Sequence, residues 1–127
     1  MEYVAIVTTL ALLQVFVFAI QVGSARVKTG VNAPAMSGAP DFDRAFRVHQ
    51  NTIEQLIIFI PSLWMFAYFV RPDIGAGIGV VFIIARQIYR AAYVRDPAKR
   101  SMGFSLGALA MMTLLIGGLV GAVKGLL

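Results

Sequence analysis

A long apolar run at the start of the chain constrains its fold most strongly. Residues 3–23 are apolar apart from four uncharged polar side chains, Thr8, Thr9, Gln14 and Gln21. As an α-helix, this run is long enough to cross the roughly 30 Å hydrocarbon core of a bilayer. Three further apolar stretches follow, so the sequence predicts an all-α integral membrane protein folded as a four-helix bundle. The spans are expected at about 3–24, 43–70, 74–94 and 98–123.

The composition excludes an ordinary soluble domain. Hydrophobic residues make up 59% of the chain and charged residues 13%, against about 45–50% and about 25% in soluble proteins. Four spans of about 20 residues fill most of the 127 residues, so we predict a single membrane domain over 1–127. The first run is interpreted as a retained span rather than a cleaved signal peptide, because Glu2 precedes it and Arg26 and Lys28 follow it.

The lack of Cys and the single His limit the nucleophiles and metal sites that the chain can form. The chain contains no Cys and only one His. Disulfides, a thiolate nucleophile, Cys-ligated metals and a multi-His metal site are therefore excluded, and no metal cofactor is expected. Any reactive thiol has to arrive with a substrate.

The basic residues indicate a membrane orientation rather than a nucleic-acid partner. The net charge is +5, and only Arg71 and Lys124 lie away from the first and third loops and the adjoining helix ends. The positive-inside rule predicts that these loops face the cytosol and that both termini lie on the opposite side. The other nine basic residues are Arg26, Lys28, Arg44, Arg47, Arg86, Arg90, Arg95, Lys99 and Arg100.

Polar side chains inside the second and third spans form two clusters. Charged groups within a span cost about 2.5–3.5 kcal/mol each on insertion scales, so each one needs a partner or a function. We expect Arg86 to be coupled to Glu54, the only acid within a span, either directly or through Asn51. One cluster lies within a wedge of about 60° on its helix and the other within about 100°. Their members are Arg47, Asn51 and Glu54, and Arg86, Tyr89, Arg90 and Tyr93.

These clusters have two interpretations. They could be a polar network that only holds the bundle together, or they could line a cytosol-facing pocket for a small anionic molecule. The excess of Arg over Glu favours the pocket. Arg100 lies in the first turns of the fourth helix, where the macrodipole adds to its field, so a thiolate would be stabilised there. Lowering the pKa of a thiol from about 8.5 to about 6.5 requires about 2.7 kcal/mol.

Three motifs in fixed order carry a family resemblance. They are Arg47-Val-His-Gln-Asn51-Thr-Ile-Glu54 with Pro61 after it, Ala85-Arg86-x-x-Tyr89-x-x-x-Tyr93, and Pro97-Ala-Lys-Arg100-Ser-Met-Gly103. This series resembles the MAPEG family, the membrane-associated proteins of eicosanoid and glutathione metabolism. It is most similar to the third type of microsomal glutathione S-transferase. The motifs cover about residues 44–107, and the four-span layout extends the resemblance over nearly the whole chain.

The resemblance implies a homotrimer with glutathione as cosubstrate, bound between neighbouring subunits on the cytosolic side. Arg100 matches the position that stabilises the glutathione thiolate, and Tyr93 is expected to donate a secondary hydrogen bond to the sulfur. His49 lies about 160° from the Arg47 cluster on its helix, so it is expected to reach the adjacent subunit's site or, alternatively, to bind water at headgroup level. The expected glutathione-binding residues are Arg26, Arg47, His49, Asn51, Glu54, Arg86, Tyr89 and Tyr93.

We therefore predict a membrane-bound glutathione S-transferase with glutathione-dependent peroxidase activity, acting on lipophilic electrophiles or lipid hydroperoxides in detoxification. Gln55 stands where the leukotriene synthase branch has Tyr, which disfavours a dedicated leukotriene synthase. The alternative is a non-catalytic lipid-binding protein of the lipoxygenase-activating type. Arg100 and the two Tyr residues argue against it. A small multidrug transporter is disfavoured because no acid lies between Glu2 and Asp41.

Three further expectations concern the membrane, Arg90 and the spacing of small residues. Abundant Ala, Gly and Val favour a bacterial inner membrane, with the endoplasmic reticulum membrane as the alternative. Arg90 is expected to contact lipid headgroups or to add charge to the site, and the headgroup role is favoured. Small residues at four-residue spacing predict close helix approach within or between subunits. These are Gly75 and Gly79, Gly103 and Gly107, and Gly117, Gly121 and Gly125.

Overall fold

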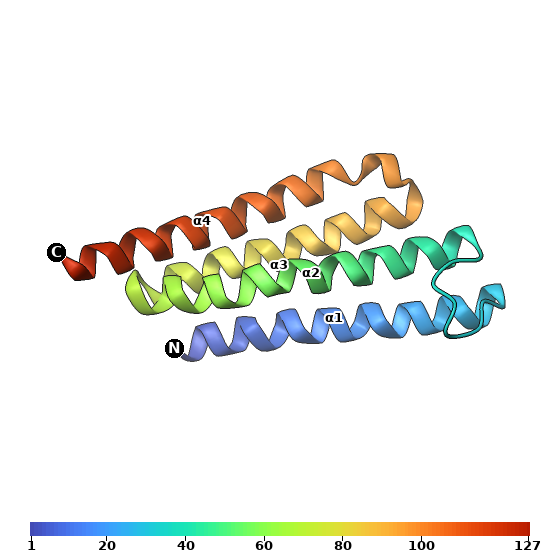
Figure 1. Cartoon of the computed structure of the whole chain (residues 1–127), viewed down its shortest axis with the longest axis horizontal. Coiled ribbons are helices and arrows are strands. Elements are labelled where there is room, and N and C mark those ends of the chain that lie inside the picture. The colour runs from blue at the N-terminus through green and yellow to red at the C-terminus, as the bar shows by residue number, and fades with distance from the viewer.

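The computed structural model describes residues 1–127 and consists of four long helices joined by short connections. Figure 1 shows that successive helices run in opposite directions and that both termini lie at the same end of the bundle. The prediction of an all-helical chain with four long apolar helices is confirmed. The elements are α1 (Glu2–Thr29), α2 (Pro40–Phe69), α3 (Pro72–Arg95), the 3₁₀-helix η1 (Pro97–Lys99) and α4 (Ser101–Leu126).

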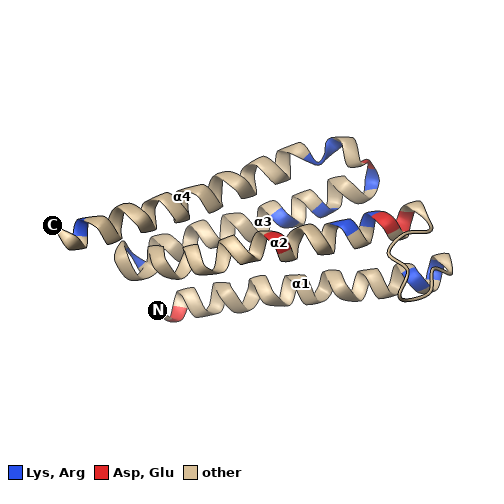
Figure 2. Ribbon diagram, in the orientation of Figure 1, with Lys and Arg blue, Asp and Glu red and all other residues tan.

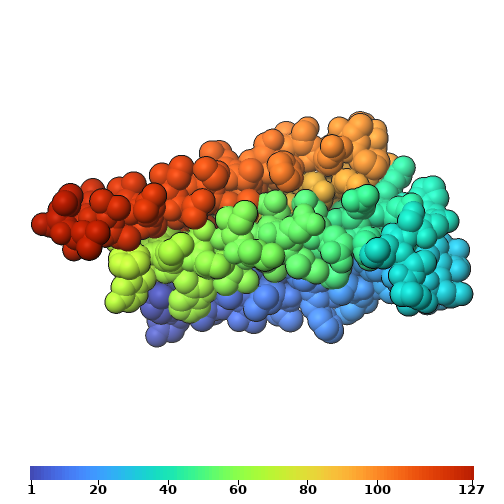
Figure 3. All heavy atoms as spheres, viewed as in Figure 1, coloured from blue at the N-terminus to red at the C-terminus, as the bar shows by residue number.

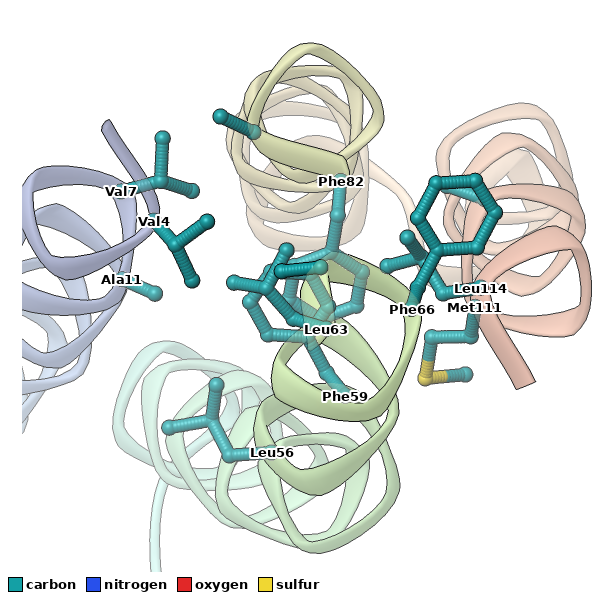
Figure 4. Packing of buried hydrophobic residues seen from close by; sticks show 13 residues of the cluster. Val4, Val7, Ala11, Leu56, Phe59, Leu63, Phe66, Phe82, Met111 and Leu114 are labelled. Atoms are coloured by element: carbon teal, nitrogen blue, oxygen red, sulfur yellow. The ribbon is translucent and has the colours of Figure 1, made fainter. Parts of the chain in front are cut away.

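The helices α2 and α3 lie at the centre of the bundle. Both contact α1 on one flank and α4 on the other, and this arrangement is visible along the bundle axis in Figure 4. The hydrophobic core fills the space between the four helices. At its middle, the rings of Phe59 and Phe82 stack with centroids 4.0 Å apart and an interplanar angle of 10°. Val4, Leu63 and Leu114 are fully buried around this pair.

The ends of α1 and α2 differ from the predicted span limits. Helix α1 continues to Thr29, so Arg26 and Lys28 lie in its last turn, where cations interact favourably with the macrodipole. Gly30 then ends α1 with φ of 76°, and its N–H donates to the Arg26 carbonyl. Helix α2 begins earlier than expected because Pro40 fits the first helical position. It continues through Pro61.

The α3–α4 connection is compact. The Asp96 carboxylate accepts a hydrogen bond from the Ala98 N–H at 3.1 Å, so Asp96 is a cap, with Pro97 in the first helical position after it. The cap starts η1 rather than α4. Arg100 is the residue immediately before α4 and therefore lies at its amino-terminal end.

Glycines let the helices approach closely within one chain. A Cβ at Gly103 would lie 2.5 Å from the Tyr89 backbone nitrogen, and one at Gly121 would lie 2.8 Å from the Phe69 carbonyl oxygen. Gly75 and Gly79 face side chains of α2 and, for Gly79, Val7 of α1. The predicted close approach is therefore found inside the subunit, although Gly125 has no neighbour within 4 Å.

The exterior of the bundle is apolar along most of its length. Only 28 of the 127 residues are buried, so most of the large hydrophobic side chains lie on the surface. All four helices are long and apolar enough to cross a membrane. Figure 2 shows Lys and Arg gathered at the end of the bundle that carries the α1–α2 and α3–α4 connections. At the opposite end, α4 extends beyond the other helices (Figure 3).

Candidate functional site

Arg86 is the centre of a buried polar cluster between α2 and α3. Its side chain is 1% exposed, and its Nη2 donates to Asn51 Oδ1 at 2.7 Å and to Thr52 Oγ1 at 2.8 Å. The Thr52 hydroxyl in turn donates to the Val48 carbonyl oxygen at 2.7 Å. A buried guanidinium is thus held by neutral oxygens rather than by a carboxylate.

The face of an aromatic ring also supports the Arg86 charge. The guanidinium carbon lies 4.1 Å from the ring centroid of Tyr89, which is cation–π geometry. The ring of Tyr89 packs against that of Tyr93, with centroids 5.5 Å apart. We call Arg86, Asn51, Thr52 and Tyr89 the Arg86 cluster. This cluster links α2 to α3 at the depth where both spans contain polar residues.

A cavity of about 360 Å³ lies beside the Arg86 cluster. It brings together one predicted residue from each of three helical segments, Asn51 of α2, Tyr89 of α3 and Arg100 at the start of α4. Because Gly103 has no side chain, the start of α4 packs directly against the α3 backbone at Tyr89. We call this space the Arg100 cavity. Its other lining residues are Ala98, Ser101 and Phe104.

Arg100 is positioned by the local structure of the α3–α4 connection. Its Nη1 donates to the Pro97 carbonyl oxygen at 2.8 Å, and the side chain remains exposed. Because Arg100 immediately precedes α4, its charge adds to the positive end of the α4 macrodipole. The cavity therefore combines a cation, a helix amino terminus, a phenol and an amide, a set suited to binding an anion.

The predicted coupling of Arg86 to Glu54 is wrong. The Glu54 side chain is exposed on α2, and neither an ion pair nor a hydrogen bond links it to Arg86 or Asn51. The cause is the direction of the Glu54 side chain around the axis of α2. Arg86 approaches α2 between Asn51 and Thr52, and Glu54 points about 110° away from that direction on the helix.

Other predicted site residues lie outside the Arg100 cavity of the single chain. Arg26 donates from Nη1 to the Ala35 carbonyl oxygen at 2.8 Å, and its guanidinium carbon lies 4.5 Å from the Phe42 ring centroid. Arg47 is exposed, and His49 is half-buried on another face of α2. The cavity thus holds part of the predicted site.

The sequence reasoning missed Thr52, Ser101 and Phe104. Thr52 directly follows the motif residue Asn51, but its position toward Arg86 depends on the rotation of α2 against α3. Helical spacing could have predicted Phe104 as a site residue, because it lies four residues after Arg100 and therefore on the same side of the helix start. Its ring centroid is 6.4 Å from that of Tyr89.

Several known proteins are similar to this chain over most of its length. It is 44% identical over 116 residues to an uncharacterized protein of Synechocystis sp., an alignment that covers 91% of this chain and 85% of that protein. It is 42% identical over 113 residues to microsomal glutathione S-transferase 2 of Homo sapiens, covering 87% and 77% of the two chains. It is also 33% identical over 110 residues to leukotriene C4 synthase of Bos taurus, covering 87% and 73%.

These relatives agree with the predicted transferase branch. The motif strings resemble the third type of microsomal glutathione S-transferase, whereas the human relative is of the second type. The sequence profile of the MAPEG family matches residues 4–120, which is nearly the whole chain. With four helices able to span a membrane, the chain is a multi-pass membrane protein. It belongs to the MAPEG family.

Proposed function

We propose that this protein is a membrane-bound glutathione transferase whose active centre is the Arg100 cavity. The observation that carries the proposal is the convergence of Asn51, Tyr89 and Arg100 on one cavity. These three residues come from three different helical segments, and the family resemblance assigns each of them to glutathione. Two of the relatives described above are named for the glutathione transferase and leukotriene C4 synthase reactions.

In the proposed mechanism, Arg100 and the amino terminus of α4 favour the ionised form of the glutathione thiol. The thiol proton passes to water, and the thiolate sulfur attacks an electrophilic carbon. A carbon–sulfur bond forms while the leaving group departs with its electron pair. Tyr93, packed on Tyr89, is proposed to donate a hydrogen bond to the sulfur. Holding both reactants in one cavity supplies the remaining rate enhancement through proximity.

We assign the remaining glutathione contacts to an assembled homotrimer. Arg47 and Glu54 are exposed on α2, where they are free to bind a carboxylate and the ammonium of the tripeptide. Arg26 and His49 lie away from the Arg100 cavity, so we place them in the site of the adjacent subunit. The extensive apolar surface of the single chain supports burial of some helix faces against other subunits.

The shared site can be tested by complementation. Arg26→Ala and Arg100→Ala variants are each expected to lose most conjugation activity. Co-expression of the two chains with different affinity tags would form mixed trimers in which one site retains both Arg residues. Recovery of activity in doubly purified assemblies supports a site shared between subunits. Mixed assemblies that stay as inactive as the parents would contradict it.

The same thiolate supports the proposed peroxidase activity. One glutathione thiolate attacks the distal oxygen of a lipid hydroperoxide, which releases the lipid alcohol. A second glutathione then resolves the sulfenic acid, giving glutathione disulfide and water.

We propose that the lipophilic substrate reaches the cavity from the membrane along the exposed apolar faces of α1 and α4. We further propose that the membrane is a bacterial inner membrane and that the basic end of the bundle is on its cytosolic side.

The role of Arg100 is tested by the absorbance of the glutathione thiolate on mixing with purified protein. At a pH below the pKa of the bound thiol, Arg100→Ala is expected to lower the thiolate signal about tenfold for each unit by which that pKa rises. Lys99→Ala is the matched control, because it removes a neighbouring exposed cation. An unchanged thiolate signal in Arg100→Ala would reject the role.

Conjugation of an aryl halide by the wild-type protein distinguishes a transferase from a non-catalytic lipid-binding protein.

A further inference from the structure

We infer that the basic end of the bundle carries a second site, which binds the phosphate–ammonium headgroup of a phospholipid of the phosphatidylethanolamine class. The site is a cavity of about 260 Å³ between α1, the start of α2 and α3. The polar residues that carry the argument are Gln21, Ser24 and Lys28 of α1, Asp41 of α2 and Arg90 of α3. We call this cavity the headgroup pocket.

The headgroup pocket is separate from the proposed active centre. No residue lines both cavities. Arg90 follows Tyr89 directly in the chain, and the two side chains therefore leave α3 about 100° apart. Tyr89 faces the Arg100 cavity near α4, whereas Arg90 faces α1. The two pockets thus use different faces of α3.

Arg90 is held in place but not neutralised. Its Nε donates to Gln21 Oε1 at 2.5 Å across the α1–α3 interface, and the side chain is half-buried. This bond fixes the plane of the guanidinium. The two terminal nitrogens donate to no other group of the chain, so they remain available for a bidentate contact. The planar fork of Arg matches two oxygens of a phosphate.

The charges of the headgroup pocket fit a zwitterion better than a simple anion. Lys28 and Arg90 contribute two positive charges, and Asp41 contributes one negative charge. None of the three belongs to an ion pair, since the ion pairs of the chain are confined to Met1 with Glu2 and Arg71 with Asp73. A simple phosphate would be attracted by the two cations but repelled by Asp41. A headgroup with a phosphate and a primary ammonium engages all three.

The depth of the pocket favours a membrane lipid over a free metabolite. Arg90 lies five residues before the end of α3, so at 1.5 Å per residue it is about 8 Å from that end, near the level of lipid headgroups. From Gln21 toward the middle of the bundle, α1 carries Val17 and Leu13 at four-residue spacing, with side chains 47% and 53% exposed. This stripe gives an acyl chain an apolar surface directly beneath the headgroup.

The proposal is tested by lipid retention. Wild-type protein in detergent is titrated with phosphatidylethanolamine, phosphatidylcholine and phosphatidylglycerol of identical acyl chains, and bound lipid is counted by native mass spectrometry. Phosphatidylethanolamine is expected to bind most tightly, because the quaternary ammonium of phosphatidylcholine cannot donate to Asp41 and phosphatidylglycerol has no cation. Equal binding of the three lipids would overturn the proposal. Water-soluble phosphoethanolamine that binds as tightly as the lipid would identify a free phosphate compound instead.

Two variants separate the roles of the charges. Arg90→Gln is expected to weaken phosphatidylethanolamine binding about tenfold, since it removes a charge-assisted contact to phosphate. Asp41→Asn is expected to keep phosphate binding but to abolish the preference over phosphatidylglycerol, with aryl halide conjugation unchanged. Lys99→Gln removes a cation from η1, in the α3–α4 connection at the same end of the bundle, and is the control. An unaltered lipid preference in Asp41→Asn, or an equal loss of binding in Lys99→Gln, would refute the site.

Discussion

Arg86 of α3 holds the side chain of Asn51 of α2, with Nη2 2.7 Å from Oδ1. Because the Asn51 oxygen accepts this bond, its NH₂ group is left to donate elsewhere. Asn51 also lines the Arg100 cavity, whereas Arg86 does not. A fully buried cation therefore fixes the orientation of a residue in the proposed active centre, and we regard Arg86 as a positioning residue.

We predict that Arg86 and Asn51 act as a coupled pair in glutathione binding. Arg86→Met, Asn51→Ala and the double variant form a cycle that is measured by the dissociation constant of glutathione in detergent micelles. The coupling free energy is expected to be about 0.5–3 kcal/mol, as found for contacting residues in one network. Effects that add to within about 0.3 kcal/mol would mean that Arg86 does not position Asn51.

Thr52 is expected to stabilise the fold through Arg86. Thr52→Val removes the hydroxyl that accepts a hydrogen bond from Arg86 Nη2, so one buried N–H of the guanidinium loses its partner. The free energy of unfolding should therefore fall by about 1–3 kcal/mol. Thr113→Val is the matched control, because the Thr113 hydroxyl makes the same type of bond to the carbonyl four residues earlier but is exposed. Thermal unfolding in detergent compares the two. Equal losses would show that the Arg86 contact contributes nothing.

Gly103 is expected to tolerate no side chain. The Cβ of Gly103→Ala would lie 2.5 Å from the Tyr89 backbone nitrogen and 2.9 Å from the Ala85 carbonyl oxygen, so α4 must move away from α3. We expect a loss of about 1–3 kcal/mol in stability together with lower conjugation activity. Gly125→Ala has open space around it and is expected to be neutral or slightly stabilising. A fully stable and active Gly103→Ala protein would contradict this packing.

Glu54 is expected to contribute to glutathione binding rather than to the stability of the fold. Since Glu54 is exposed and makes no ion pair, Glu54→Gln should leave the free energy of unfolding within about 0.5 kcal/mol of wild type. Glutathione should nevertheless bind more weakly, because the proposed contact to its ammonium is lost. Isothermal titration and thermal unfolding of the same preparation separate the two effects. Glu2→Gln serves as a control at the far end of α1. A large loss of stability in Glu54→Gln would point to a partner for Glu54 within the bundle.

The helices and their caps follow from local sequence patterns. Apolar run length predicted four long helices. Asp96-Pro97 is typical of a helix start, and in the structure it begins η1. The limits of α1 were less predictable. Arg26 and Lys28 look like residues of a loop after a span, yet they continue the helix until Gly30 ends it. Hydrophobicity defines where a span can enter the membrane, whereas backbone capping defines where the helix stops.

The partners inside the bundle were only partly predictable. The sequence predicted Glu54 as the partner of Arg86, with Asn51 only as a possible bridge between them. Arg86 does bind Asn51, but Glu54, about 60° from Asn51 on α2, makes no hydrogen bond or ion pair with Arg86. Thr52 takes that place instead. A helical wheel gives angles around one axis and leaves open how that helix is rotated against its neighbour. In this bundle, the rotation of α2 is set by its packed core side chains, including Phe59 against Phe82.

The sequence by itself determined the membrane-spanning class, the four helices, the concentration of positive charge at one end and the family motifs, because each depends on residue type and spacing along the chain. Only the tertiary structure decided that Arg86 binds Asn51 and Thr52, and that Asn51, Tyr89 and Arg100 share a cavity. It also decided that Arg90 faces a separate pocket with Gln21. These pairings depend on helix rotation and close approach, which arise from packing between segments far apart in the chain.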